Sequence, residues 1–261
     1  MRINKELYTS HIVNTEKKLE MRKILDKVEL VLKNHSIEYT DFLDPHMRYL
    51  AKSILNRFED IKYREFGGTS NAERMVIFIY PYYLDDSYVE FSLTYLRVNG
   101  EEEDLTHKDF LGALLGLGIK RSKTGDILVH KGYTDIILKN EISAVAMQSL
   151  DRVGNKKVVL TEINADELTD PEISFKEISK FISSMRLDAF LSSIYNISRQ
   201  ESINIIKDGN VKVNWEEIYK PSKELNAGDN ISTRGYGRAI INSIDGFSKK
   251  GRLHITVQIL I

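Results

Sequence analysis

The sequence predicts an α+β fold with a helical N-terminal region, a small α/β sandwich in the middle and a C-terminal module of helices and short strands. Three observations lead to this prediction. Apolar residues recur at helical spacing before residue 59, alternate at strand spacing from residue 61, and return to helical spacing after residue 185. A chain of 261 residues with 42% apolar side chains is long enough for two or three units with their own cores.

Residues 1–58 are expected to form the helical N-terminal region. Between Leu7 and Leu32, apolar side chains recur every three or four residues among Lys and Glu. A second helix is expected over residues 45–58, because Asp44 is a good N-cap and Pro45 suits the first helical position.

Residues 59–165 are expected to form the α/β sandwich, with helices on one face of a sheet. The predicted helices cover residues 106–117 and 141–150. The predicted strands are rich in β-favouring residues and often end at Gly or Pro; they cover residues 61–66, 75–80, 88–98, 127–130, 133–138 and 157–163.

Residues 166–184 are expected to form a linker, and residues 185–261 the C-terminal module. The segment 164–171 is polar and acidic, and the segment 175–184 resembles a strand more than a helix. In the module, Ser198 and Glu201 have the spacing of a capping box, and Gly209 suits the end of that helix. The first helix presents one apolar face: Leu187, Phe190, Leu191 and Ile194.

The C-terminal motifs resemble a known RNA-binding module. Arg186-Leu187-Asp188 is followed by Ser198-Arg199, eleven residues after the leucine. Two further motifs then appear in order: Ile206-x-x-Gly209-x-Val211-x-Val213-Asn214 and Gly228-Asp229-x-Ile231-x-x-Arg234-Gly235. In order and spacing, these motifs are similar to those of the S4 RNA-binding module.

Three earlier motifs extend the resemblance to almost the whole chain. They are Phe42-Leu43-Asp44-Pro45, then Phe66-Gly67-Gly68 with Ala72-Glu73-Arg74, and Leu117-Gly118-Ile119-Lys120-Arg121 with Gly125-Asp126-Ile127. Together they resemble the YlmH family of bacterial S4-domain proteins, often encoded near cell-division genes. The resemblance implies an RNA-recognition-like middle domain, binding to the large ribosomal subunit and a role in the rescue of stalled nascent chains.

Arg186 and Arg199 are the main candidates for RNA contact, because each stands at the predicted start of a helix. Helix N-termini favour phosphate, and a guanidinium adds bidentate contacts. The alternatives are that Asp188 only pairs with an arginine or caps the helix, and that Lys207 and Lys212 are only solvated. The full set of candidate RNA-binding residues is Arg186, Asp188, Ser198, Arg199, Gln200, Lys207, Lys212, Asn214, Arg234 and Arg238.

A loop in the middle region is a possible secondary RNA contact. Lys120, Arg121 and Lys123 lie between Gly118 and Gly125. The loop superficially resembles the Lys-Met-Ser-Lys-Ser loop of aminoacyl-tRNA synthetases, but an ATP site is rejected because no nucleotide-binding motif precedes it. The alternative is a solvated turn.

The distribution of charge is consistent with a polyanionic partner at the two ends of the chain. Residues 1–64 carry 13 basic and 10 acidic side chains, residues 65–184 carry 13 and 20, and residues 185–261 carry 11 and 8. The formal net charge is only −1, so any anion-binding surface must be local. The alternative is that surface charge simply varies between domains.

Several kinds of site are not expected. The chain has no Cys, its six His are scattered, and it lacks P-loop, Gly-x-Gly-x-x-Gly and Gly-x-Ser-x-Gly motifs. We therefore expect no catalytic residues, metal, cofactor or small-molecule substrate. A membrane-spanning run and a signal peptide are also absent, so we expect a cytoplasmic protein without membrane contacts.

The leading hypothesis is a non-catalytic factor that binds structured RNA: rRNA of the large ribosomal subunit and tRNA. One alternative is an RNA-modifying enzyme, similar to a pseudouridine synthase or a methyltransferase, that uses the S4 module to hold RNA. Residues 57–163 offer neither the length nor the glycine-rich loop that such enzymes need. A second alternative is an interaction protein linked to cell division.

Overall fold

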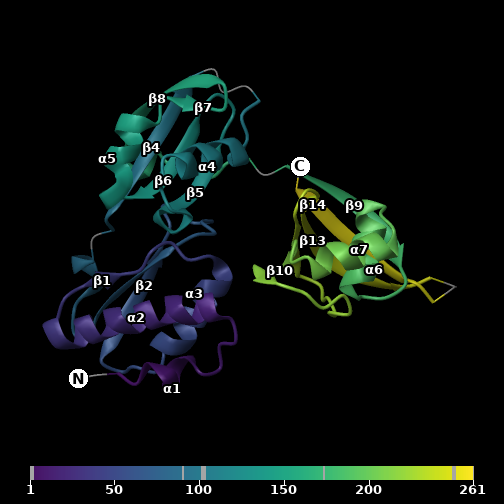
Figure 1. Cartoon of the computed structure of the whole chain (residues 1–261), viewed down its shortest axis with the longest axis horizontal. Helices are drawn as coiled ribbons and strands as arrows, with labels where there is room; N and C mark the ends of the chain where they lie inside the picture. The colour runs from purple at the N-terminus through teal and green to yellow at the C-terminus, as the bar shows by residue number, and fades with distance from the viewer. Residues whose placement is uncertain (1–2, 90, 101–103, 173, 249–250, 261) are drawn as a thin grey trace. The chain divides into compact units, whose positions relative to one another are not determined.

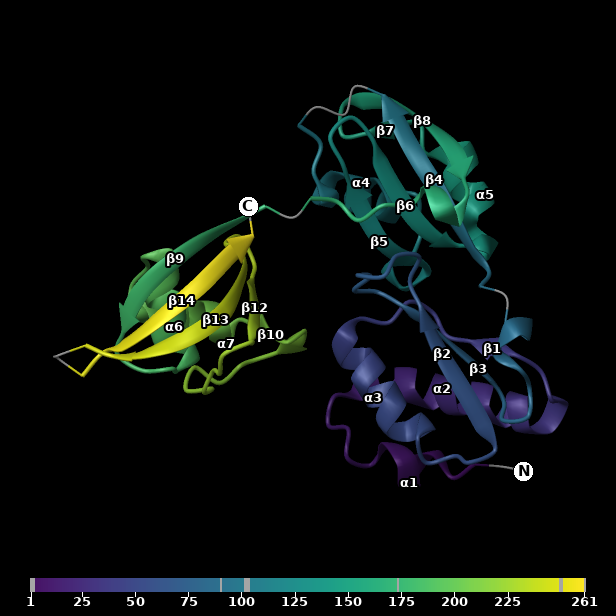
Figure 2. The ribbon, with the colours of Figure 1, turned by 180° about the vertical axis from the view of Figure 1, so that it is seen from behind.

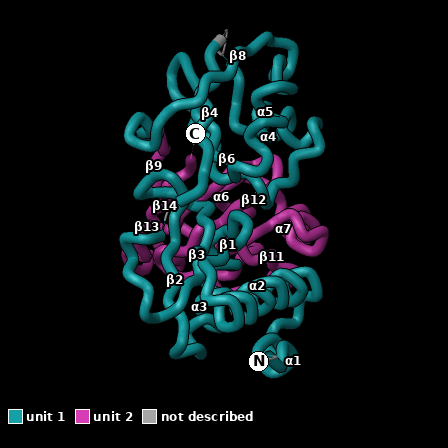
Figure 3. Tube along the Cα trace, turned by 90° about the vertical axis from the view of Figure 1, so that its left-hand side faces the viewer, with its two compact units in different colours: residues 1–171 teal, residues 172–261 magenta. Residues whose placement is uncertain are grey.

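Residues 1–171 and 172–261 form separate units in the computed structural model, as Figure 3 shows by colour. The structure describes residues 3–89, 91–100, 104–172, 174–248 and 251–260. Each unit combines helices with sheet, and each is described by itself (Figure 1).

The first unit begins with α1 (Lys5–Thr9), α2 (Thr15–Asn34) and α3 (Pro45–Leu55). The expected cap of α3 is confirmed: the Asp44 carboxylate accepts a hydrogen bond from the Met47 N–H at 2.8 Å, and Pro45 opens the helix. These helices accompany a three-stranded sheet of order β1-β3-β2, formed by β1 (Glu38–Tyr39), β3 (Val76–Pro81) and β2 (Ile61–Phe66).

The sheet assignment of β2 and β3 differs from the expectation. Both strands were expected in the middle sheet, but they pair with each other and with β1. Ile77 and Ile79 pack with α2 and α3, and Phe78 packs in a second core that the middle sheet shares. A strand buried on both faces has a continuous apolar sequence, which does not reveal its partners. The expected boundary between residues 58 and 59 would separate α3 from the sheet it covers.

The middle region follows the order β-α-β-β-α-β. Its elements are β4 (Leu93–Gly100), α4 (His107–Gly116), β5 (Thr124–Val129), β6 (Thr134–Lys139), α5 (Asn140–Ser149) and β8 (Lys156–Ile163), with the short β7 (Arg152–Val153) before β8. The sheet order is β5-β6-β4-β8-β7. Both helices pack on one face through a core that includes Leu96, Phe110 and Ala146. Single turns of 3₁₀ helix cover Asp86–Tyr88, Arg121–Lys123 and Ala165–Glu167.

The second unit is a six-stranded sheet of order β11-β10-β12-β13-β14-β9, with two helices on one face. The helices are α6 (Leu187–Tyr195) and α7 (Arg199–Lys207). The strands are β9 (Phe175–Ile182), β10 (Val211–Val213), β11 (Glu216–Glu217), β12 (Asn230–Thr233), β13 (Gly237–Phe247) and β14 (Leu253–Leu260). In Figure 2, seen from behind, β13 and β14 stand in front of α6.

Two strands of this unit differ from the sequence-based expectation. The strand expected near residues 175–184 is present, but β9 pairs with β14 from Phe175 to Ile182, so it lies in the sheet and not in a linker. The long strand β13 was not predicted. Its second half is polar and contains Gly246, and its register with β14 shifts twice, so apolar alternation is lost.

Candidate nucleic-acid interface

Arg186, Asp188 and Arg199 form one cluster at the starts of α6 and α7. The Asp188 carboxylate accepts hydrogen bonds from Arg186 Nε at 3.1 Å and Nη2 at 2.8 Å, and from Arg199 Nη2 at 3.1 Å. Asp188 is 1% exposed, whereas the side chains of the two arginines are 44% and 46% exposed. One buried carboxylate thus positions two guanidinium groups at the surface.

Local sequence explains why the two helix starts meet. Asn196 takes a left-handed conformation (φ 54°) that ends α6, and Ser198 then caps α7 by accepting a hydrogen bond from the Glu201 N–H at 3.0 Å. Ser202, one turn into α7, donates through its hydroxyl to the Asp188 carbonyl at 2.9 Å. This bond holds the first turn of α7 against the first turn of α6.

The arginines keep the Asp188 carboxylate ionised. Desolvation by burial acts to raise the pKa of Asp188, but hydrogen bonds and charge from Arg186 and Arg199 outweigh it and lower that pKa. The hydrogen bond to Asp188 also raises the pKa of Arg186. Two guanidinium charges against one carboxylate leave one positive charge in surplus at an exposed surface.

The start of α6 differs from the expected phosphate site in one respect. The Leu187 N–H donates to the Lys223 carbonyl at 2.8 Å, and the Asp188 N–H donates to the Pro221 carbonyl at 3.1 Å. The Ala189 N–H donates to the Asp188 carboxylate at 2.9 Å. The first backbone donors of α6 are therefore engaged within the chain, which leaves the arginine side chains as the groups that could hold an anion here.

Several other candidates lie on the helical side of the unit. Gln200 bonds Asn204 one turn later, and Lys207 is exposed in the last turn of α7. Arg234 is exposed in the turn between β12 and β13. This turn contacts α7, because the Tyr236 hydroxyl donates to Glu201 at 3.2 Å.

Lys212, Arg238 and Asn214 do not join the arginine cluster. Val211 and Val213 face the core under the helices, so Lys212 between them lies on the other face of the sheet. Arg238 shares that face, since both residues pair with Ser232. The predicted basic strip is therefore divided between two faces. The amide of Asn214 bonds Asp229 and the Asn230 N–H, which gives this side chain a role in the turn.

Lys220 and Lys223 were not singled out from the sequence. Both are exposed; Lys223 supplies one of the two carbonyl groups that bind the first N–H groups of α6, and Lys220 directly precedes Pro221, which supplies the other. This brings their backbone close to Arg186, which forms a β-bridge with Glu224. No local motif marks them, because their position depends on a contact with a segment far earlier in the chain.

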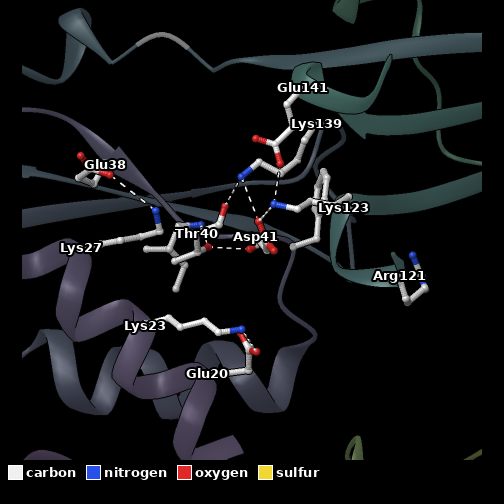
Figure 4. Close-up of polar contacts among 12 residues, drawn as sticks. Glu20, Lys23, Lys27, Glu38, Thr40, Asp41, Arg121, Lys123, Lys139 and Glu141 are labelled. Atoms are coloured by element: carbon white, nitrogen blue, oxygen red, sulfur yellow. Dashed lines mark hydrogen bonds and ion pairs between the residues drawn. The ribbon is translucent and has the colours of Figure 1, made fainter. Parts of the chain in front are cut away.

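The loop with Lys120, Arg121 and Lys123 uses two of its three basic side chains internally. Arg121 Nη1 donates to the carbonyls of Thr124 and Gly125, both at 2.8 Å, and burial lowers the pKa of Arg121 to about 10. Figure 4 shows that Lys123 points toward Asp41, to which it is bound at 2.7 Å. Of the three, only Lys120 is exposed, and Arg121 and Lys123 are partly buried; RNA contact by this loop stays a prediction.

A second lysine shares the Asp41 site. Lys139 is 4% exposed, and its ammonium group donates to the Thr40 carbonyl at 2.9 Å and to Asp41 at 3.2 Å (Figure 4). Burial lowers the pKa of Lys139, and the contact with Asp41 opposes this effect. These bonds join β6 of the middle sheet to the strand region of the N-terminal sheet.

The three N-terminal motifs that carry the family resemblance meet at this same contact between the N-terminal sheet and the middle sheet. Arg74 donates to the carbonyls of Phe42 and Thr124, at 2.9 and 3.1 Å. The Asp126 carboxylate accepts from the Glu73 N–H at 2.6 Å. Their described contacts are structural, since they fasten the N-terminal sheet to the middle sheet.

The fold and the arginine cluster define the chain as an S4-domain protein with further domains. Residues 185–231 match the family model described as S4 domain. Residues 16–84 match "YlmH, N-terminal", and residues 87–167 match "Putative RNA-binding domain in YlmH". The curated "Ribosome-associated protein quality control protein P2" of Bacillus subtilis (strain 168) is 30% identical over 236 residues, 90% of this chain and 91% of that protein. The chain therefore belongs to the YlmH family.

A solved structure shares part of the fold. It is titled "Cell division protein ylmH from Streptococcus pneumoniae" and is 22% identical, with a TM-score of 0.54. The match covers 60% of this chain and 96% of the solved one. In the parts of the chain that the structure describes, no helix has the length and apolar character needed to cross a membrane.

Proposed function

We propose that this protein is a non-catalytic RNA-binding factor that acts in the cytoplasm on the large ribosomal subunit, through rRNA and tRNA, in the rescue of stalled nascent chains. The observation that carries the proposal is the pair of half-exposed arginines held on buried Asp188. The matches to S4 and RNA-binding domains support the RNA part, and the name of the Bacillus subtilis relative supports the ribosomal part.

The arginine pair suits structured RNA. Guanidinium groups fixed by a buried acceptor lose little freedom on binding, and their outward N–H groups can form bidentate contacts with phosphate. Such contacts read backbone shape more than base sequence. Lys207, Arg234, Lys220 and Lys223 are exposed on the same unit and can extend the contact.

Binding to large ribosomal subunits tests the proposal. We expect the full chain to sediment with 50S particles and to bind an rRNA hairpin, and Arg186→Ala with Arg199→Ala to weaken hairpin affinity roughly tenfold to hundredfold. The slope of log affinity against log salt should fall by about 2, because two phosphates would no longer be neutralised by an arginine. The matched control removes two exposed lysines of the first unit, Lys33→Ala with Lys62→Ala, and should bind as the original. Unchanged binding by the arginine variant would contradict the assigned surface.

The non-catalytic part of the proposal has its own test. Mass spectrometry of ribosomal RNA and tRNA from a deletion strain should show the same modified nucleotides as the parent strain. A nucleotide that loses its modification, and regains it when the gene is restored, would favour the RNA-modifying alternative.

A further inference from the structure

The turn between β10 and β11 carries the chain's single tryptophan in an unusual backbone conformation. Val213 pairs with Glu216, which leaves Asn214 and Trp215 as a two-residue turn with φ values of 50° and 64°. Turns of this type favour Asn followed by Gly, because both residues need positive φ. A bulky aromatic residue at positive φ is rare, and such strain persists mainly where it serves a function.

The surrounding residues hold this turn in place. The Asn214 N–H donates to the Asn230 carbonyl at 2.8 Å, and the Asn214 amide oxygen accepts from the Asn230 N–H at 2.9 Å. The amide nitrogen of Asn214 donates to Asp229 at 2.8 Å. The neighbouring indole is thus presented from a well-fastened turn while it stays partly exposed, outside the apolar core of the unit.

A guanidinium group lies beside the indole. The Arg238 Cζ atom is 5.8 Å from the centre of the Trp215 ring. Arg238 and Lys212 flank Ser232 in a row across three strands, on the face of the sheet away from α6 and α7. An exposed aromatic ring with an arginine beside it is the arrangement that stacks unpaired bases in single-stranded nucleic acid.

Nearby carboxylates narrow the class of ligand. Glu216 and Glu217 follow Trp215 directly, and Glu217 pairs with Lys212 at 3.5 Å. A double helix would bring two rows of phosphates close to these carboxylates, which is unfavourable. A neutral base on the indole, with its own phosphate near Arg238, avoids that repulsion.

We propose that Trp215 and Arg238 form a stacking site for one unpaired nucleotide of RNA, on the face of the sheet opposite the helices. The C-terminal unit then holds two RNA segments at once: structured RNA at the arginine pair and an unpaired base at Trp215. This inference rests on the proposed function only in taking RNA as the ligand.

Tryptophan fluorescence tests the site directly, because Trp215 is the only tryptophan in the 261 residues. We expect a single-stranded adenosine-uridine octamer that cannot pair with itself to quench the fluorescence of the full chain in a saturable way. Arg186→Ala with Arg199→Ala should leave this quenching intact, whereas Arg238→Ala should weaken the octamer affinity about tenfold. Arg252→Ala, which removes an exposed arginine at the far end of the sheet, is the charge-matched control and should have no effect.

A labelled octamer gives a second readout that does not need the indole. Trp215→Leu should weaken octamer binding by about tenfold or more but leave binding of a blunt-ended RNA duplex unchanged, with an unaltered circular dichroism spectrum as the check on folding. The inference is overturned if quenching does not saturate, if the double arginine variant abolishes it, or if Trp215→Leu binds the octamer normally. Failure of the proposed function would instead appear as hairpin binding that does not depend on Arg186 and Arg199.

Discussion

Asp188 sets the geometry of the candidate interface at the scale of single residues. Its carboxylate is almost fully buried and accepts hydrogen bonds from both arginines and from the Ala189 N–H. The sequence alone left open whether Asp188 contacts RNA or pairs with an arginine. In the structure it pairs with two, so its role in the proposed RNA binding is to orient them.

Replacing Asp188 should separate this orienting role from RNA contact. We expect Asp188→Asn to lower the free energy of unfolding of the C-terminal unit by about 1–3 kcal/mol, because two charged hydrogen bonds lose their ionised acceptor. Urea unfolding followed by Trp215 fluorescence reports on this unit alone. The control is Asp245→Asn, an acid of the same unit that is far more exposed, which should change stability much less. Equal effects of the two variants would contradict the role given to Asp188.

The lowered pKa of Asp188 also predicts how stability depends on pH. The ionised form is favoured in the folded state, so the stabilisation is complete above the ordinary carboxyl pKa of about 3.9 and is lost as pH falls through the lower folded value. Below about pH 4, the original chain should therefore lose more stability per pH unit than Asp188→Asn. Parallel curves of urea midpoint against pH for the two proteins would refute this prediction.

At the scale of elements, the sequence predicted helix starts better than sheet membership. The caps at Asp44 and Ser198 depend on residues three positions apart, so local sequence is sufficient. A local apolar pattern does not show which sheet a strand joins, which is why β2 and β3 were placed in the wrong sheet. The strand β13 was missed because its polar second half and two register shifts hide the alternation. The candidate site shows the same limit of local sequence. The motif located Arg186 and Arg199, but the burial of Arg121 depends on residues that are distant in the sequence, so it could not be predicted.

Gly125 tests how tightly the N-terminal sheet and the middle sheet are joined. A Cβ atom at this position would lie 2.8 Å from Phe42 Cε1 and 3.2 Å from the Ile137 Cβ. Gly125→Ala should therefore destabilise the first unit by about 1–3 kcal/mol through overpacking. The measurement is differential scanning calorimetry of the full chain. Trp215 lies in the second unit, so the calorimetric transition that its fluorescence does not follow is assigned to the first unit.

Gly112 provides the matched control. It lies within α4, where a new Cβ atom would meet no other atom within 4 Å. Gly112→Ala should raise stability by up to about 1 kcal/mol, because alanine favours a helix over glycine. If Gly125→Ala were tolerated as well as Gly112→Ala, the close packing around Phe42 would not be important for stability.

At the scale of the whole molecule, the position of β9 determines where the C-terminal unit can be cut. β9 pairs with β14 over eight residues and contributes Ile182 to the core. We expect a fragment of residues 172–261 to unfold cooperatively in urea. A fragment of residues 185–261, the module as first expected, should be less stable and more prone to aggregate, because β14 becomes a long exposed edge. Equal stability of the two fragments would show that β9 is dispensable.

The packing between the two sheets of the first unit affects how the middle domain can be studied in isolation. Tyr95 on β4 and Ile137 on the adjacent strand β6 are covered by Phe42 and its neighbours in a shared core. An isolated fragment of residues 87–167 would expose these apolar side chains to solvent, and the exposed patch would favour non-specific association. RNA affinity measured on such a fragment would include binding to a patch that is buried in the intact chain.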